Sequence, residues 1–189
     1  MRVLLVGVSC VGKTTIGTIL ARRLGCAFFD LDAEIERHFG TSIERLQARF
    51  LTDYSFRTEC TVVLKRIAMN NPNCVIALAP SGLRDAYLRV IRKVPCVTVA
   101  IGDKPEHILE RITFYDIDSK PIEKHLTEEE KRLYLREIKK DITFFKKSRQ
   151  RADLQADLAG LDAEPSAKLI EDLVNEHSHG RTYSQSSAG

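Results

Sequence analysis

Short apolar runs alternate along the chain with longer segments whose apolar positions recur at helical spacing. The apolar runs predict strands at Val3–Val6, Ala27–Phe29, Val75–Ala79, Val97–Ile101 and Leu154–Ala156. The longer segments predict helices at Lys13–Leu24, Ala33–His38, Thr52–Met69, Leu83–Arg92, Glu106–Thr113, Glu128–Lys147 and Ala167–Asn175. Strands that are apolar throughout are typical of a parallel sheet covered on both faces, so the alternation predicts an α/β fold.

Two stretches interrupt this alternation. Residues 114–126 have no clear period and contain Pro121, which predicts an excursion over the surface. After His177 the sequence holds almost nothing apolar, so we expect residues 177–189 to form a disordered tail. The remaining length suffices for one core, and residues 1–176 are predicted to form a single domain.

Composition and charge exclude several function classes. The 29 basic and 26 acidic residues give a net charge of +3, and no block of like charge indicates nucleic-acid binding. No apolar run approaches the ~20 residues of a membrane span, and we see no targeting segment. The five cysteines include no CxxC pair, and four of them stand in or beside apolar stretches, which is typical of reduced, buried thiols. We therefore expect a cytoplasmic protein that binds neither nucleic acid nor membranes.

The most specific signal is a glycine-rich loop between the first predicted strand and the first predicted helix. Residues 7–14 read GVSCVGKT, a complete G-x-x-x-x-G-K-[ST] motif. In this motif the glycines let backbone N–H groups turn toward phosphate oxygens, the lysine bridges the outer phosphates and the threonine hydroxyl ligates Mg²⁺. The motif therefore predicts a site for a nucleoside triphosphate. Nucleotide contacts are expected at Gly7, Val8, Ser9, Cys10, Val11, Gly12, Lys13, Thr14 and Thr15.

Two acidic residues follow the second predicted strand. Asp30 and Asp32 stand at its carboxyl end, the edge where open α/β sheets bind ligands. One carboxylate can face a magnesium ion while the other meets a hydroxylated substrate. Either residue could instead serve as the N-cap of the helix that follows, and the residues alone leave both interpretations open.

Further motifs follow one another in order along the chain. They are Gly17-x-x-Leu20-Ala21-x-x-Leu24-Gly25, Phe28-Phe29-Asp30-Leu31-Asp32, Gly40-Thr-Ser-Ile43, Phe56-Arg57-x-Glu59, Val75-Ile-Ala-Leu78, Glu110-Arg111 and Lys120-Pro121-Ile122. This ordered set resembles the shikimate kinases, and the resemblance is clear up to Glu59. It implies a monomeric kinase that uses ATP and Mg²⁺. The implied fold is a three-layer α/β/α P-loop NTPase, like a nucleoside monophosphate kinase, with a five-stranded parallel sheet, a substrate-binding region at about 33–60 and a lid at about 114–126.

The resemblance also implies roles for the acidic residues and their neighbours. Thr14 and Asp30 would hold Mg²⁺. Asp32 would contact the substrate hydroxyls and orient or deprotonate the attacking oxygen. Arg57 would pair with a substrate carboxylate, because a planar guanidinium meets a carboxylate with two parallel bonds, and Glu59 would brace Arg57.

Three basic residues complete the implied machinery. Lys13 and Lys120 are expected to be catalytic, and Lys120 stands where the family has a lid arginine. Arg111 would contact the adenine side of the nucleotide. Lysine keeps the charge of arginine but lacks its fork, so it would stabilise the transition state less well. An alternative, which the residues leave equally open, is that Lys120 is a solvated loop residue.

Two segments depart from the family pattern. Residues 79–82 read Ala-Pro-Ser-Gly where the family has a triple glycine, and Pro80 has no N–H to donate. Ser81 and Gly82 are expected to contact the substrate in its place. Beyond the lid, several basic residues compete for the role of a second clamp on the substrate carboxylate, and Arg136 is our choice among them.

The leading hypothesis is therefore an ATP-dependent kinase that phosphorylates a hydroxyl of a small carboxylated polyol, with shikimate giving shikimate 3-phosphate. The altered residues 79–82 leave open another small-metabolite kinase, such as a gluconate kinase. Pro80 and Lys120 leave open a nucleotide-binding regulatory module without catalysis.

Overall fold

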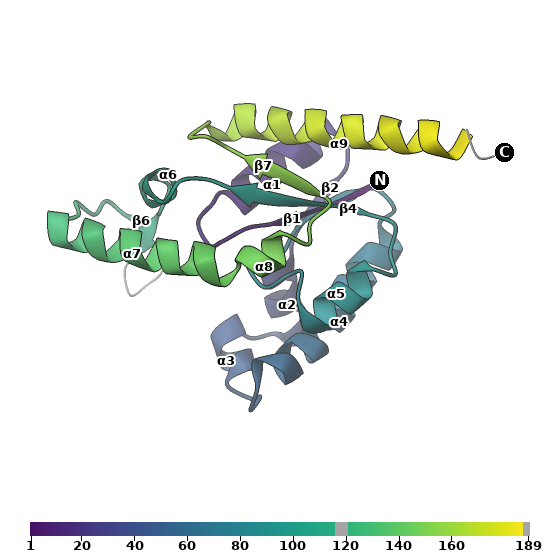
Figure 1. Cartoon of the computed structure of the whole chain (residues 1–189). Coiled ribbons are helices and arrows are strands. Elements are labelled where there is room, and N and C mark those ends of the chain that lie inside the picture. The colour runs from purple at the N-terminus through teal and green to yellow at the C-terminus, as the bar shows by residue number, and fades with distance from the viewer. Residues whose placement is uncertain (116–120, 187–189) are drawn as a thin grey trace.

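The computed structural model describes residues 1–115 and 121–186, in which one five-stranded sheet carries the core (Figure 1). Its strands are β1 (Arg2–Val6), β2 (Ala27–Asp30), β3 (Cys74–Ala77), β4 (Val97–Gly102) and β7 (Leu154–Asp157). They lie in the order β2-β3-β1-β4-β7, and every pairing is parallel. The predicted five-stranded parallel sheet is confirmed.

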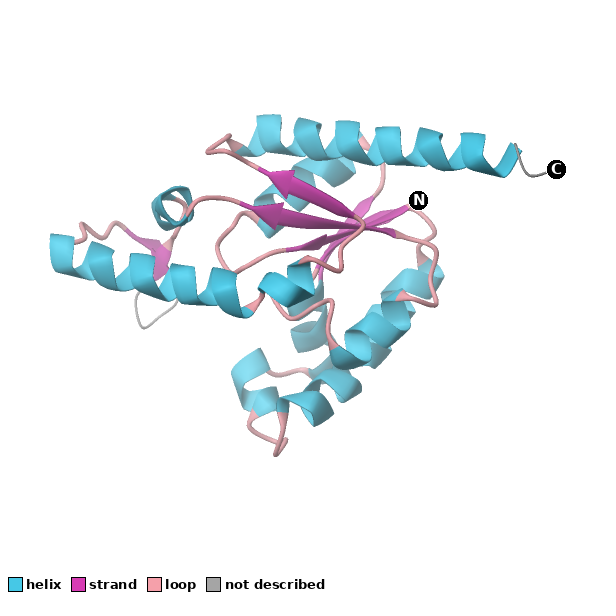
Figure 2. Ribbon diagram, viewed as in Figure 1, coloured by secondary structure: helices cyan, strands magenta, loops and turns pink. Residues whose placement is uncertain are grey.

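Helices cover both faces of this sheet (Figure 2). They are α1 (Lys13–Arg23) and α9 (Ala163–Ser186) on one face, and α2 (Leu31–Phe39), α4 (Asp53–Asn70) and α5 (Asp85–Ile91) on the other. Successive side chains of a strand point to opposite faces, so Leu5 of β1 packs with α1 and α9 while Leu4 packs with α2, α4 and α5. Both leucines are buried, which explains why the strand is apolar throughout.

Further elements complete the described part of the chain. They are α3 (Ile43–Gln47), α6 (Pro105–Glu110), α7 (Glu128–Phe144), α8 (Lys146–Arg149) and the antiparallel pair β5 (Phe114–Tyr115) and β6 (Pro121–Ile122). The carboxyl ends of β4 and β7 point toward the side of the molecule that carries α6 and α7 (Figure 1). Because all five strands are parallel, the loops that follow them meet at this edge.

Side-chain caps determine where two of the helices begin. The Thr52 hydroxyl accepts a hydrogen bond from the Ser55 backbone N–H at 3.1 Å, which starts α4. Thr127 and Glu130 form a reciprocal capping box at the start of α7. These local signals agree with the sequence expectations for both helices to within one residue at their N-terminal ends.

The C-terminal helix is longer than expected. α9 runs to Ser186, so the prediction of a disordered tail from residue 177 is wrong up to that residue, and 187–189 lie outside the described residues. Ala167, Ile170 and Val174 are buried against the sheet and anchor the helix. Once a helix has formed, each added hydrogen bond requires only one more residue to become ordered, so the helix can continue. Neither α9 nor any other described helix has the length and apolar character needed to cross a membrane.

Candidate active site

The glycine-rich loop joins the carboxyl end of β1 to the start of α1. Gly12 has a φ of 102°, a left-handed conformation that favours glycine, and it occupies the N-cap of α1 without a side-chain cap. At Gly7 the constraint is space, since a Cβ atom would lie 2.8 Å from the Ile101 carbonyl oxygen and from Val11 Cγ1. The two glycines of the motif are thus required for different reasons. The first N–H groups of a helix have no partner within it, so those of α1 can donate hydrogen bonds to an anion bound in the loop.

Lys13 reaches back over this loop. Its Nζ donates hydrogen bonds to the carbonyl oxygens of Gly7 and Val8, at 3.1 and 2.9 Å. Burial lowers the pKa of Lys13, and the negative charges of Asp32 and Asp30 act in the opposite direction. The ammonium group therefore contacts the loop and feels the charge of both carboxylates, and its bridging of phosphates stays a prediction.

Asp30 serves two purposes at once. One carboxylate oxygen accepts from the Asp32 backbone N–H at 3.1 Å and caps α2. The other accepts from the Thr14 hydroxyl at 2.7 Å. Both interpretations of Asp30 are thus compatible, because the N-cap geometry itself aims the second oxygen at Thr14. These two oxygen-bearing side chains have the donor chemistry that Mg²⁺ prefers, and no group of three or more metal-ligating residues occurs among the described residues.

Asp32 lies in the first turn of α2 and is half-buried. Burial raises the pKa of its carboxyl above the ordinary value, and the neighbouring charge of Asp30 adds to the effect, while Lys13 opposes it. Within residues 1–115 and 121–186 no hydrogen bond restrains the Asp32 carboxylate. A desolvated carboxylate of raised pKa is a stronger base than a solvated one, which suits removal of a proton from a hydroxyl.

A pocket of about 480 Å³ opens beside the phosphate loop. Its wall includes Lys13 and Thr14 on one side and Arg111, Leu161 and Asp162 on the other. Arg111 therefore lines the same pocket as Lys13 and Thr14, and its contact with a nucleotide stays a prediction. The contribution of the segment after β7 was not predicted, because its residues carry no motif.

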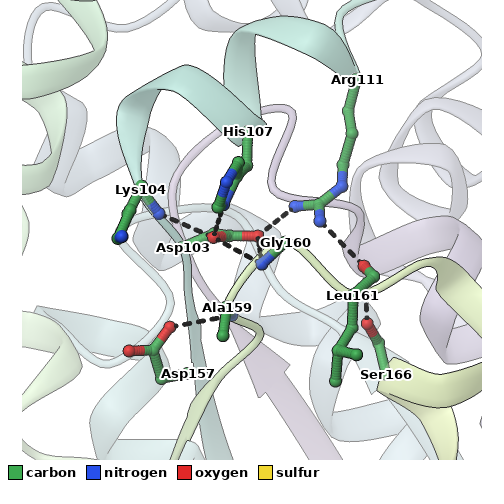
Figure 3. A network of polar contacts seen from close by, with 9 residues as sticks. All are labelled: Asp103, Lys104, His107, Arg111, Asp157, Ala159, Gly160, Leu161 and Ser166. Carbon is green, nitrogen blue, oxygen red and sulfur yellow. Dashed lines mark hydrogen bonds and ion pairs between the residues drawn. The ribbon is translucent and has the colours of Figure 1, made fainter.

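A buried carboxylate fixes this second wall (Figure 3). The Asp103 side chain is 0% exposed, and it accepts hydrogen bonds from Arg111 Nη1 at 2.6 Å and from the Gly160 N–H at 3.2 Å, while His107 Nδ1 lies 2.7 Å away. Burial alone would raise the pKa of Asp103, but hydrogen bonds from His107 and Arg111 outweigh it and lower the pKa. Arg111 Nη2 also donates to the Leu161 carbonyl at 2.9 Å. Asp103 thus ties α6 to the loop after β7.

Arg57 projects from the first turns of α4, and its side chain is only 15% exposed. Its Nη2 donates to Asp85 Oδ2 at 3.0 Å, and its Nη1 lies 3.7 Å from Asp53 Oδ2. Its partners are therefore Asp85 and Asp53, and the expectation that Glu59 braces Arg57 is wrong. The Nε atom is buried and has no hydrogen-bond partner among the described residues.

Residues 79–84 form tight turns in place of the family's triple glycine. The Gly82 N–H donates to the Ala79 carbonyl at 2.8 Å, and the Arg84 N–H donates to the Ser81 carbonyl at 3.0 Å. A Cβ atom on Gly82 would lie 2.6 Å from Leu78 Cβ, so this glycine is required for close packing. The Gly82 N–H is already used inside the loop. Of the two residues predicted to contact the substrate, Ser81 alone has a polar side chain.

Two predicted residues remain, Arg136 and Lys120. Arg136 is exposed on α7, in a groove that it shares with Arg132 and Lys139, and no contact among the described residues joins it to Asp32 or Arg57. Lys120 falls outside the described residues. The structure therefore brings Lys13, Thr14, Asp30, Asp32 and Arg111 together at the phosphate loop, with Arg57 beside the Ala79–Asp85 segment.

This arrangement defines the P-loop kinase class of α/β proteins. The shikimate kinase family model matches residues 9–173, and the chain belongs to the shikimate kinase family. A shikimate kinase from Aquifex aeolicus is 33% identical over 135 residues, which cover 71% of this chain and 77% of that protein. The bifunctional shikimate kinase/3-dehydroquinate synthase of Thermotoga maritima is 34% identical over 113 residues, which cover 60% of this chain and 22% of that protein.

The fold of the chain is also similar to that of solved shikimate kinase structures. The shikimate kinase of Acinetobacter baumannii in complex with shikimate has a TM-score of 0.68 and 25% sequence identity, with 93% of each chain covered. The likeness therefore extends through nearly the whole chain.

Proposed function

We propose that this protein transfers the γ-phosphoryl group of ATP to a hydroxyl of a small carboxylated polyol, and that the acceptor is shikimate. The observation that carries this proposal is that the carboxyl end of β2 adjoins the phosphate loop, where Asp30 contacts Thr14. The Thr14 hydroxyl donates to Asp30 at 2.7 Å, and the charges of Asp32 and Lys13 act on each other's pKa. Transfer of a phosphoryl group to an alcohol requires a carboxylate next to the phosphate site, to orient the hydroxyl and accept its proton.

The nucleotide is proposed to bind with its phosphates in the loop of residues 7–14 and its base near Arg111. The pocket beside Lys13 and Thr14 extends to Arg111, which supports this direction. Thr14 and Asp30 would hold Mg²⁺, which neutralises phosphate charge when bound. One carboxylate and one hydroxyl suffice, because Mg²⁺ takes further oxygen ligands from phosphates and water.

The acceptor is proposed to lie between Asp32 and Arg57. Asp32 orients the attacking hydroxyl and accepts its proton, and Lys13 stabilises the charge that develops on the transferring phosphoryl oxygens. Arg57 binds the acceptor carboxylate. Its buried Nε–H supports this role, since a buried donor without a partner is costly and a carboxylate ligand would satisfy it.

Lys120 and Arg136 remain proposals that rest on the family resemblance alone. Lys120 would approach the transferring phosphate from the lid, and Arg136 would be a second carboxylate clamp if α7 closes over the site. We also keep the prediction of a monomeric cytoplasmic protein.

The test is to measure ATP turnover with shikimate and with a panel of hydroxy acids and sugar acids. Turnover that is strongest with shikimate supports the proposal. Turnover that occurs only with another acceptor would replace shikimate by that compound. Nucleotide binding without transfer to any member of the panel would favour the regulatory module.

A further inference from the structure

The partner of Arg57 is the feature that the proposed function leaves unexplained. Asp85 lies on α5, 28 residues away along the chain, and its Oδ2 accepts from Arg57 Nη2 at 3.0 Å. The Arg57 side chain is 15% exposed and that of Asp85 is 35% exposed, so water screens this pair only in part. Before any acceptor binds, the Arg57 guanidinium, which is proposed to bind the acceptor carboxylate, is already paired with the carboxylate of Asp85.

The unusual turn after β3 places Asp85 at this position. Gly82 packs directly against Leu78, and the successive turn hydrogen bonds let α5 begin at Asp85. The backbone of Asp85 has a φ of 48°, in the left-handed region that non-glycine residues seldom adopt. Aspartate tolerates this conformation better than most residues. The segment that lacks the family's glycines is therefore the segment that delivers the carboxylate.

The geometry of the guanidinium makes this contact consequential. A guanidinium offers a carboxylate two bidentate edges, one formed by Nε and Nη2 and the other by Nη1 and Nη2. Nη2 belongs to both edges, and it is the nitrogen that donates to Asp85. Nε has no partner among the described residues, so one edge is half-occupied. An acceptor carboxylate must therefore displace Asp85 or share Arg57 with a like charge.

We propose that Asp85 is an internal competitor for Arg57, which occupies the guanidinium in the absence of acceptor and weakens the binding of a carboxylated acceptor. Asp85 would thus set acceptor affinity and bias the site toward acceptors that depend less on their carboxylate. This inference rests on the proposed function, because it assumes that Arg57 receives the acceptor.

The test is the variant Asp85→Asn, which removes the charge and keeps a side chain that tolerates the left-handed backbone. We expect the KM for shikimate to fall about tenfold, as is reasonable for removing one like charge at a partly screened site. The kcat should stay within about twofold, since Asp85 does not act on the reacting atoms. An unchanged or higher KM would overturn the inference, because a merely structural role predicts weaker binding after substitution.

The matched control is Asp53→Asn. Asp53 also approaches Arg57, but at 3.7 Å and with 63% of its side chain exposed, so its removal should change the KM by less than about twofold. Equal effects of the two substitutions would show a general charge effect and would count against a specific role for Asp85.

A double-variant cycle shows whether the effect passes through Arg57. In an Arg57→Gln background, Asp85→Asn should no longer lower the KM. A persisting decrease would overturn the proposed route. If neither the wild type nor the variants phosphorylate shikimate, and calorimetry detects no shikimate binding, the proposed function fails and the inference falls with it. Turnover by the wild type with an unaltered KM in Asp85→Asn would overturn the inference alone.

Discussion

The proposed nucleotide side and the proposed acceptor side of this site differ in the groups that form them. The phosphate loop is formed largely by backbone groups, and two glycines fix its conformation for reasons of φ and of space. The proposed acceptor side depends on long side chains, and Arg57, the residue proposed at its centre, pairs with Asp85 from a distant segment. The backbone site keeps its form as long as its two glycines are present, whereas a side-chain site can be altered by one substitution nearby. The family function is therefore secured at the phosphates and open to variation at the acceptor.

The largest effect is expected where the two sides meet. Asp32→Asn should lower turnover by about 10²–10⁴-fold, the contribution typical of a positioned general base. Nucleotide affinity should change little, since Asp32 makes no hydrogen bond to the phosphate loop among the described residues. Steady-state kinetics and calorimetry with ADP measure the two quantities. Wild-type turnover in this variant would remove Asp32 from the mechanism.

A change on the nucleotide side should affect stability as well as binding. Asp103→Asn leaves the partly buried donors of His107 and Arg111 facing a neutral amide, and we expect a loss of about 2 kcal/mol in the free energy of unfolding. The KM for ATP should rise, because Arg111 loses its anchor.

Urea unfolding and the KM for ATP check this prediction. Asp172→Asn is its control, because Asp172 forms an exposed ion pair with Lys168 on α9 and should cost less than about 0.5 kcal/mol. Equal losses in both variants would show that the Asp103 network contributes nothing beyond an ordinary surface pair.

A change on the acceptor side should be confined to that side. Arg57→Lys keeps the charge but loses the bidentate fork, so the KM for shikimate should rise about tenfold while the KM for ATP stays constant. Kinetics with each substrate varied in turn separate the two constants. A parallel rise of both KM values would mean that Arg57 supports the whole cleft and that the two sides are not independent.

The smallest effect concerns the pH dependence of stability. The raised pKa of Asp32 means that the folded protein binds this proton more tightly than the unfolded chain does. Its burial therefore costs stability above the raised folded pKa and costs nothing below the ordinary value of 3.8. Asp32→Asn should make the protein more stable at pH 7, with a gain that shrinks as the pH falls through this window.

Urea unfolding of wild type and Asp32→Asn at several pH values measures this difference. A gain that does not depend on pH would assign the effect to packing and not to charge.

Features encoded by a local motif or by apolar periodicity could be predicted from the sequence, whereas contacts between distant segments could not. The strands, most helices and the group around Lys13, Thr14 and Asp30 could be predicted, because a local motif and apolar periodicity encode them. The partner of Arg57 could not be predicted, because it depends on the turn that places α5 against α4. Asp103 was missed for a related reason, since its partners lie on α6 and after β7.

The extent of α9 was missed because its last turns are polar. Composition indicates disorder there, whereas a helix already anchored by Ile170 and Val174 can continue through polar residues.

The most direct measurement is a crystal structure of the protein with ADP, Mg²⁺ and shikimate. The account predicts that ADP fills the loop of residues 7–14, that the Asp32 carboxylate lies within hydrogen-bond distance of an acceptor hydroxyl, and that Arg57 contacts the acceptor carboxylate. An acceptor bound elsewhere, or an Asp32 side chain turned away from both ligands, would contradict it.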